Sequence, residues 1–210
     1  MTVAGFMVTV AGVIKRRPMR DRPSPSGLAS ILERKSPSFF SAVRHDWIYL
    51  LGEGRTAAVL ELNCGNGATG AVALRDGKCA KWVGVESDAG AAANAREVLT
   101  DALAGDVEAL ELPYPEGTFD ILFMGERLPY FTRPQASMAK LVRLLRRGGR
   151  LFLAAEGDPL PAWLSPERVH KLLKRAGLGA IEVRAAADEG RRSLFQRPRY
   201  YRLEVSGRRR

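Results

Sequence analysis

The sequence predicts a doubly wound α/β sandwich, in which a mostly parallel sheet carries helices on both faces. Strand-like and helix-like segments alternate from residue 57 onward. Such alternation favours a parallel sheet, because each connecting helix packs back onto the strands that it joins. The chain has 210 residues, of which 46% are apolar and 27% charged, so one ordinary globular core is expected.

Each expected strand is a short apolar run bounded by turn residues, and most are followed by a segment with helical spacing of apolar positions. No helical pattern separates the last two strands, so an antiparallel closing pair is expected. Residues 39–51 have the apolar spacing of an amphipathic helix, and we expect them to form an N-terminal cap helix. The expected strands are 57–62, 82–85, 103–104, 119–124, 150–155, 180–184 and 200–205, and the other helices are 68–75, 90–99, 135–145 and 166–176.

The N-terminal region differs in composition from the rest of the chain. Residues 15–38 contain four prolines and many charges, which indicates an arm or linker. We therefore divide the chain into an N-terminal extension, 1–38, and one domain, 39–210. The first 14 residues are apolar, but a membrane-spanning helix needs about 20 residues. A basic run follows them at Lys15, whereas a secretory signal begins with its charges. An added strand, a partner-binding piece and a flexible extension remain open, and no membrane span is expected.

The net charge is +10 and is unevenly distributed. Residues 1–50 have 8 basic and 3 acidic side chains, residues 51–140 have 8 and 13, and residues 141–210 have 17 and 7. The basic flanks are compatible with nucleic acid or another acidic partner. A basic composition that keeps the protein in solution is the simpler interpretation.

Cysteine usage indicates a reducing compartment. The two cysteines, Cys64 and Cys79, cannot form a disulfide framework, and no Cys/His spacing typical of a metal site is present. We therefore expect a cytoplasmic protein without a metal.

The most informative motif is a strand, a glycine-rich turn and a helix in succession. The apolar run ending at Leu62 meets glycines at 65, 67 and 70, and a helix-compatible segment follows. In this context a nucleotide cofactor can lie against bare backbone. Glu86 ends the next strand, 21 residues after Gly65, where a carboxylate can accept hydrogen bonds from a ribose diol.

Three further motifs follow in order. GDVEAL, beginning at Gly105, comes after the third strand; LPYPEGTFD leads into the fourth; and LVRLLRRGGRLFL ends a helix in the Gly148–Gly149 turn before the next strand. Together with ELNCGNG and VGVES, these motifs resemble the class I S-adenosylmethionine-dependent methyltransferases, particularly the group known as methyltransferase domain 11. The resemblance covers roughly 39–183.

The resemblance implies a Rossmann-like, seven-stranded sheet, S-adenosylmethionine as cofactor and methyl transfer to an O, N or C nucleophile. By position, Glu61 would lie near the cofactor's amino group and Glu86 would hold the ribose. Asp106 would accept from the adenine amine and the Val107 amide would donate to the ring. The residues implied to bind the cofactor are Glu61, Asn63, Cys64, Gly65, Asn66, Gly67, Glu86, Ser87, Asp106, Val107 and Gly125.

On the acceptor side, the resemblance places the reacting atoms after the fourth strand. Glu126 is the candidate general base, needed only if the acceptor arrives protonated. Tyr130 is the second catalytic candidate and would line the acceptor pocket with Phe131. Phe40 and Trp47 would cover it from the cap helix. All four aromatic side chains are equally compatible with a place in the core.

Several residues have simpler interpretations or depart from the family pattern. Asn63 stands where relatives have glycine; asparagine tolerates left-handed backbone, but its side chain would crowd the methionine tail. The run from Glu126 to Tyr130 lacks the histidine found in many relatives. Asp106 is equally suited to capping a turn. Glu61 is equally compatible with an ordinary carboxylate at a strand end, and Cys64 with a residue of the core. His170 is expected on a solvated helix face.

The acceptor stays open at this stage. A small-molecule or glycan methyltransferase is the leading hypothesis, as a monomer or homodimer. The alternatives are an RNA or protein methyltransferase recruited by the basic flanks, and a catalytically silent S-adenosylmethionine-binding subunit, which Asn63 and the missing histidine suggest. The block that begins at Gly105 has no role in a nicotinamide-dependent dehydrogenase and disfavours that class.

Overall fold

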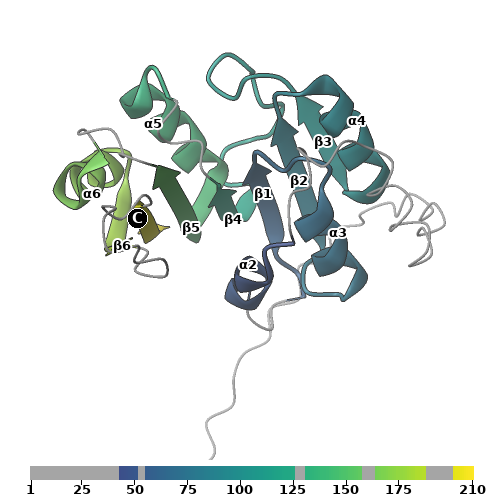
Figure 1. Cartoon of the computed structure of the whole chain (residues 1–210), viewed down its shortest axis with the longest axis horizontal. Coiled ribbons are helices and arrows are strands. Elements are labelled where there is room, and N and C mark those ends of the chain that lie inside the picture. The colour runs from purple at the N-terminus through teal and green to yellow at the C-terminus, as the bar shows by residue number, and fades with distance from the viewer. Residues whose placement is uncertain (1–42, 52–54, 126–130, 158–163, 188–200) are drawn as a thin grey trace, which may run out of the picture.

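A computed structural model of the chain describes residues 43–51, 55–125, 131–157, 164–187 and 201–210 (Figure 1). The seven described strands form one sheet in the order β3-β2-β1-β4-β5-β7-β6. The helices are α2 (His45–Leu50), α3 (Ala68–Arg75), α4 (Ala89–Val98), α5 (Pro134–Leu144) and α6 (Pro166–Arg175). The strands are β1 (Ala58–Leu62), β2 (Lys81–Glu86), β3 (Asp101–Ala104), β4 (Phe119–Met124), β5 (Leu145–Gly157), β6 (Leu178–Ala187) and β7 (Tyr201–Arg209).

The topology confirms the expected fold class. Strands β3, β2, β1, β4 and β5 pair in parallel, whereas β7 runs antiparallel to both β5 and β6. The chain winds outward from β1 in one direction through β2 and β3, and in the other through β4. The strand order therefore reverses between β1 and β4, and ligands of such sheets bind in the crevice at the carboxyl ends of the strands at that point.

Two apolar clusters cover the two faces of the sheet. Alternate residues of β1 belong to different clusters, since Val59 lies in one and Leu60 in the other. The cluster with Val59 contains an aromatic stack, in which the Trp47 ring of α2 lies 4.6 Å from Phe123 and the Trp82 ring lies 5.7 Å from it. In Figure 1, α3 and α4 lie at the β2–β3 end of the sheet and α5 and α6 at the β5–β6 end.

One expectation was wrong in a physically informative way. The glycine pair Gly148–Gly149 does not separate helix from strand, because α5 passes directly into β5 at Leu145. The glycines instead lie in an irregularity of β5, where the pairing with β4 shifts between Phe119 and Ile121. Gly148 has φ 75°, and a Cβ on Gly149 would lie 2.8 Å from the Arg146 carbonyl oxygen. Glycine is therefore required at these positions by a bulge inside the strand.

The described part of the cap helix is shorter than expected. It begins at His45, after Val43 and Arg44, while residues 39–42 lie outside the described residues, as does the whole extension 1–38. Among the helices that the structure describes, none combines the length and the apolar character needed to cross a membrane.

Candidate active site

The turn between β1 and α3 is built from left-handed backbone. Asn63 has φ 57°, Gly65 φ 54° and Gly67 φ 80°. The Asn63 amide donates to the Val85 carbonyl at 2.9 Å, which ties the turn to the end of β2. A Cβ on Gly67 would also lie 2.9 Å from Cγ of Leu99. Asn63 thus adopts the left-handed backbone conformation that glycine also reaches, as expected for a residue that tolerates positive φ.

Glu86 lies directly at this turn, as the sequence spacing predicts. One carboxylate oxygen accepts from the Gly65 amide at 2.9 Å. The other accepts from the Asp88 amide at 3.1 Å and from the Ser87 hydroxyl at 3.2 Å. The half-buried carboxylate is therefore held in one orientation at the carboxyl end of β2, next to backbone that carries no side chain.

A shallow hollow opens beside Glu86, at the carboxyl ends of β1, β2 and β3. It encloses about 180 Å³, including space open to solvent. Several residues implied by the sequence resemblance meet here. Its lining residues are Leu62, Asn63, Val85, Ser87, Gly105 and Val107.

Asp106 stands between Gly105 and Val107, two residues that line the hollow, and caps a turn. Its side chain is exposed, and Oδ1 accepts from the Glu108 amide at 3.1 Å. The capping role considered from the sequence is therefore present. It does not conflict with a ligand contact, because a carboxylate has about four acceptor positions.

Glu108 joins the wall of the hollow to α5. Its carboxylate accepts from the Thr132 amide at 2.8 Å, the Thr132 hydroxyl at 2.9 Å and the Arg133 amide at 3.0 Å. The Ser137 hydroxyl donates to it at 2.6 Å. Partial burial raises the pKa of Glu108, but these donors outweigh it and bring the pKa to about 2.

A second contact fixes the same wall. The ammonium of Lys140, on α5, donates to the Val107 carbonyl at 3.3 Å and to that of Leu110. Neither Glu108 nor Lys140 was expected at the site from the sequence. The sequence contains one indication of these contacts, the hydroxyl residues Thr132 and Ser137 around Pro134. They mark the N-terminus of a helix but do not show which residue contacts it.

Glu61 is a buried carboxyl group with a core partner. Its side chain is 4% exposed, and Oε2 accepts from the Trp82 indole at 2.8 Å. Burial raises the pKa of Glu61 to about 8, although the Trp82 hydrogen bond and the charge of Arg44 lower it. The carboxyl group lies close enough to Arg44 and Glu86 to respond to both charges.

Cys64 and Asn66 are buried residues of the glycine turn whose side chains pack inside the protein. Cys64 is 1% exposed, and a Cβ on Gly84 would lie 2.4 Å from its Sγ. Burial raises the pKa of the Cys64 thiol far above its usual range, so it is a core residue and no nucleophile. Asn66 is buried, and its side-chain oxygen accepts from Asn94 at 3.1 Å. Both side chains therefore have contacts within the protein.

On the acceptor side, the structure describes only part of what the sequence proposes. Gly125 follows β4 at the crevice, and a Cβ there would lie 3.5 Å from the Trp47 ring. Trp47 and Phe131 are 4% and 6% exposed, which places both in the core. The candidates Glu126, Tyr130 and Phe40 lie outside the described residues.

Comparison with known families decides the identity. Residues 60–153 match a family model described as a methyltransferase domain. The chain contains a methyltransferase domain and has the fold of the class I S-adenosylmethionine-dependent methyltransferases. S-adenosylmethionine is accordingly its cofactor. No curated protein sequence matches it.

Solved methyltransferase structures share the fold. An S-adenosylmethionine-dependent methyltransferase from Mesorhizobium loti is 17% identical with a TM-score of 0.60, over 80% of this chain and 99% of that one. A putative methyltransferase from Haloferax volcanii, in complex with the Trm112 activator, is 16% identical with a TM-score of 0.62, over 78% and 87%. A phosphoethanolamine N-methyltransferase from Haemonchus contortus with S-adenosylhomocysteine is 14% identical with a TM-score of 0.61, over 77% and 51%. At these identities the likeness concerns the fold and leaves the acceptor open.

Proposed function

We propose that this methyltransferase transfers a methyl group to an O, N or C nucleophile of a small-molecule or glycan acceptor. The supporting observation is the charge of the edge where the cofactor site lies. Acidic side chains gather at the carboxyl ends of the strands, and such an edge disfavours a phosphate-rich acceptor. These acidic residues are Glu86, Asp88, Asp106 and Glu108.

We assign the cofactor's parts to the residues of the crevice. Glu86 accepts hydrogen bonds from the two ribose hydroxyls. This contact is selective, because backbone amides already fix the orientation of both carboxylate oxygens. The hollow beside Val107 takes the adenine, with Asp106 at its rim. The backbone of Gly65 and Gly67 would hold the methionine end.

Methyl transfer makes modest demands on the chain's own residues. The bound cofactor supplies a methyl group activated on a cationic sulfonium, and the protein holds acceptor and sulfonium in line and excludes water. Because positive charge is lost in the transition state, no oxyanion hole is required. The assignments of Glu126 as base and Tyr130 as acceptor-lining residue remain part of this proposal. We also propose that the domain spans 39–210 and works in a reducing, cytoplasmic setting, since both described cysteines are free.

Basic residues of the C-terminal flank, 141–210, gather at the end of the sheet opposite the cofactor crevice. β5 begins where β7 ends, so Arg150 and Arg208 lie directly opposite each other on neighbouring strands. Burial, and then the charges of Arg208 and Arg146, lower the pKa of Arg150. Acidic partners compensate only part of this charge, through Glu116 with Arg143 and Arg209 and through Asp120 with Arg146. We call this group the basic edge: Arg143, Arg146, Arg147, Arg150, Arg208, Arg209 and Arg210.

The basic edge favours a second candidate function. Arginine guanidinium groups suit phosphate, so an RNA methyltransferase recruited through this surface is the alternative. A polyanion bound there would lie away from the cofactor edge, which is why the small-molecule acceptor ranks first. The Haloferax structural neighbour was solved with a methyltransferase activator, and a protein partner is a further arrangement for this architecture.

The experiment is a methyl-transfer assay against separated acceptor classes. Purified protein and methyl-labelled S-adenosylmethionine are incubated with small-molecule, glycan, RNA and protein fractions of a cell extract. Label in the small-molecule or glycan fraction, lost with Glu86→Ala, supports the proposal. Label in the RNA or protein fraction overturns it. No label in any fraction, with S-adenosylhomocysteine still bound, identifies a silent subunit instead.

A further inference from the structure

Glu108 supplies the N-terminal cap that α5 lacks in its own sequence. The helix begins at Pro134, and the preceding residue, Arg133, provides no side-chain cap. The first turn also contains no acidic residue. The Glu108 carboxylate, 25 residues before Arg133, instead accepts from the Arg133 amide at 3.0 Å, and from the Thr132 amide at 2.8 Å. A carboxylate at this place also complements the positive end of the helix dipole.

A second contact crosses in the opposite direction. Lys140, on α5, donates to the carbonyl of Val107 at 3.3 Å and to that of Leu110. These carbonyls belong to one hydrogen-bonded turn, since the amides of Ala109 and Leu110 donate to the Asp106 carbonyl at 3.0 and 2.7 Å. An anion of the turn thus binds the helix, and a cation of the helix binds the turn. The turn and the start of the helix are therefore joined as one unit.

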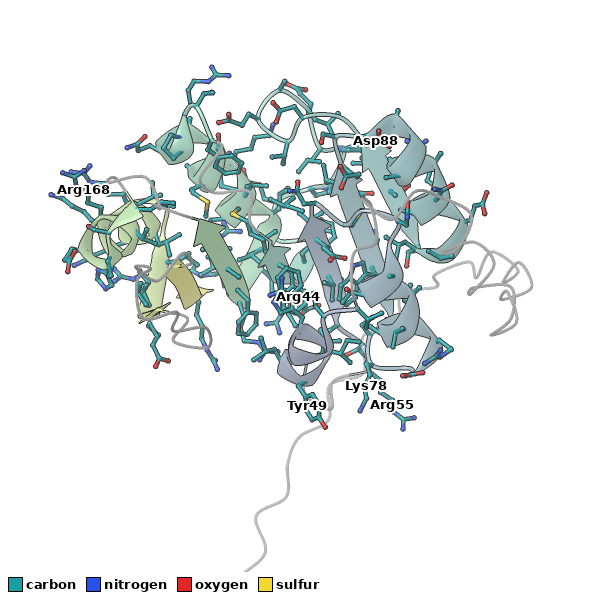
Figure 2. All side chains as sticks on the ribbon, in the orientation of Figure 1. Arg44, Tyr49, Arg55, Lys78, Asp88 and Arg168 are labelled. Carbon is teal, nitrogen blue, oxygen red and sulfur yellow. The ribbon has the colours of Figure 1, made fainter. Side chains whose placement is uncertain are left out.

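This unit spans two strands of the sheet. Turn 106–110 follows the carboxyl end of β3 and Thr132 comes after that of β4, whereas β2 and β1 lie between these strands in the sheet. The contacts therefore run beside the carboxyl ends of β2 and β1, along the hollow. In Figure 2, Asp88 marks this edge of the sheet, and Arg55 and Lys78 mark the opposite edge.

The turn also links the proposed cofactor residues to the proposed acceptor residues. Val107 lines the hollow and belongs to the same buried apolar cluster as Phe131. In the sequence, Phe131 comes directly after the stretch that contains the acceptor candidates Glu126 and Tyr130. A ligand contact at Val107 is therefore connected to the residues that follow these candidates.

We propose that Glu108 is a positioning residue for the acceptor side: it ties the start of α5 to the wall of the cofactor hollow, so that occupancy of the hollow orders both. A ligand against turn 106–110 limits the motion of the turn, and four hydrogen bonds to one carboxylate transmit this restraint to the helix. By reciprocity, order at the start of α5 strengthens cofactor binding. The inference rests on the proposed place of the cofactor, and it holds for any acceptor.

The competing explanation is that Glu108 only caps α5. A cap stabilises the helix start to the same degree with and without ligand. A residue that transmits a restraint stabilises the helix start further when the ligand binds. The two roles therefore differ in one quantity, the change that the ligand causes in hydrogen exchange at the start of α5.

Hydrogen exchange followed by NMR, without ligand and with saturating S-adenosylhomocysteine, measures this change. The Ser137 amide is the reporter, because it donates to the Arg133 carbonyl at 3.0 Å and not to the substituted side chain. In the wild-type protein the ligand should slow its exchange at least about fivefold, the lower limit of typical coupling between two sites. In Glu108→Gln this ligand-dependent change should be lost.

A milder variant tests the same contact from the helix. Ser137→Ala removes the hydroxyl that donates to Glu108 at 2.6 Å, and Ser137 is not among the residues that line the hollow. We expect S-adenosylhomocysteine to bind this variant about 2- to 30-fold more weakly in calorimetry, the range for residues that couple sites without touching the ligand. In the Glu108→Gln background, Ser137→Ala should have no further effect.

Glu116→Gln is the matched control, since it removes a carboxylate that pairs with Arg143 in the last turn of α5. It should keep the ligand-dependent change, and retained S-adenosylhomocysteine binding shows that each variant is folded. The inference is overturned if the ligand leaves Ser137 exchange unchanged in the wild-type protein, if Glu108→Gln keeps the change, or if Ser137→Ala binds the ligand like the wild-type protein. If the wild-type protein does not bind S-adenosylhomocysteine, the cofactor assignment fails, and the inference with it.

Discussion

The carboxylate of Glu86 accepts a hydrogen bond from the backbone amide of Gly65 at 2.9 Å. This contact joins the end of β2 to the glycine turn that follows β1. A carboxylate at the ribose position and bare backbone at the methionine position are thus held together before any ligand binds. Pre-positioning of this kind lowers the entropic cost of binding.

Asn63→Gly tests how the turn tolerates a side chain. The left-handed backbone, with φ 57°, is equally accessible to glycine, so the fold should be unchanged. Because the Asn63 side chain lines the hollow, its removal should hold or tighten the affinity for S-adenosylhomocysteine. Calorimetry provides the measurement. A clear loss of affinity would show that the Asn63 amide contacts the cofactor, contrary to the crowding inferred from the sequence.

Glu61→Gln should change how stability depends on pH. The pKa of Glu61 is raised from 4.5 to about 8, so the folded protein holds a proton that the unfolded chain releases. Stability therefore falls as pH rises from about 4.5 to 8 and levels off above that. The glutamine still accepts from Trp82 and does not ionise. Thermal melts should show a higher Tm for Glu61→Gln at pH 8 and little difference near pH 4, with each kcal/mol shifting Tm by about 2–4 °C. Equal pH profiles for both proteins would contradict the burial argument.

Glu108→Ala should loosen the wall of the hollow. The variant leaves the Thr132 and Arg133 amides and the Ser137 hydroxyl without their shared acceptor, at a cost of about 1–3 kcal/mol. Because the pKa of Glu108 is lowered to about 2, the contribution is present above pH 4.5 and is lost as pH falls toward 2. We expect both Tm and the affinity for S-adenosylhomocysteine to fall.

Glu116→Ala is the control for this prediction. Glu116 pairs with Arg143 near the other end of α5, and both side chains are more than half exposed, at 53% and 66%. An exposed pair contributes little, so Glu116→Ala should leave ligand affinity unchanged. Equal losses of affinity in the two variants would mean that Glu108 acts on the fold in general and not on the hollow.

Neutralising the basic edge should weaken the binding of anionic partners and leave the affinity for the cofactor unchanged. The variant Arg147→Ser, Arg208→Ser, Arg210→Ser removes three exposed charges and keeps Arg209, whose guanidinium donates to the Arg143 carbonyl at 2.6 Å. If RNA binds this surface, its affinity should fall steeply with salt and drop further in the triple variant. Fluorescence anisotropy with RNA oligomers provides the measurement. Absence of RNA binding at low ionic strength would remove the RNA alternative.

The sequence predicted those features that local patterns determine. The apolar run 121–124, with Phe119 before it, predicted the bounds of β4, Phe119–Met124. The spacing from Gly65 to Glu86 predicted that these two residues lie close together, and the fold brings them into contact. The Glu108 contacts with α5 and the Trp82–Glu61 hydrogen bond were missed, because no sequence motif links their partners as the strand and glycine-turn motif links Gly65 and Glu86. Nothing in the local sequence of either partner specifies the other. The Gly148–Gly149 bulge was mistaken for a turn because glycine serves both.

The most direct test of the central claim is calorimetric titration of S-adenosylhomocysteine and NAD into the wild-type protein and Glu86→Ala. We predict that the wild-type protein binds S-adenosylhomocysteine and not NAD. Glu86→Ala should bind it more weakly by about 1.5–3 kcal/mol, the usual contribution of hydrogen bonds to a charged group. Binding of NAD in place of S-adenosylhomocysteine, or equal affinity in the two proteins, would contradict the site described here.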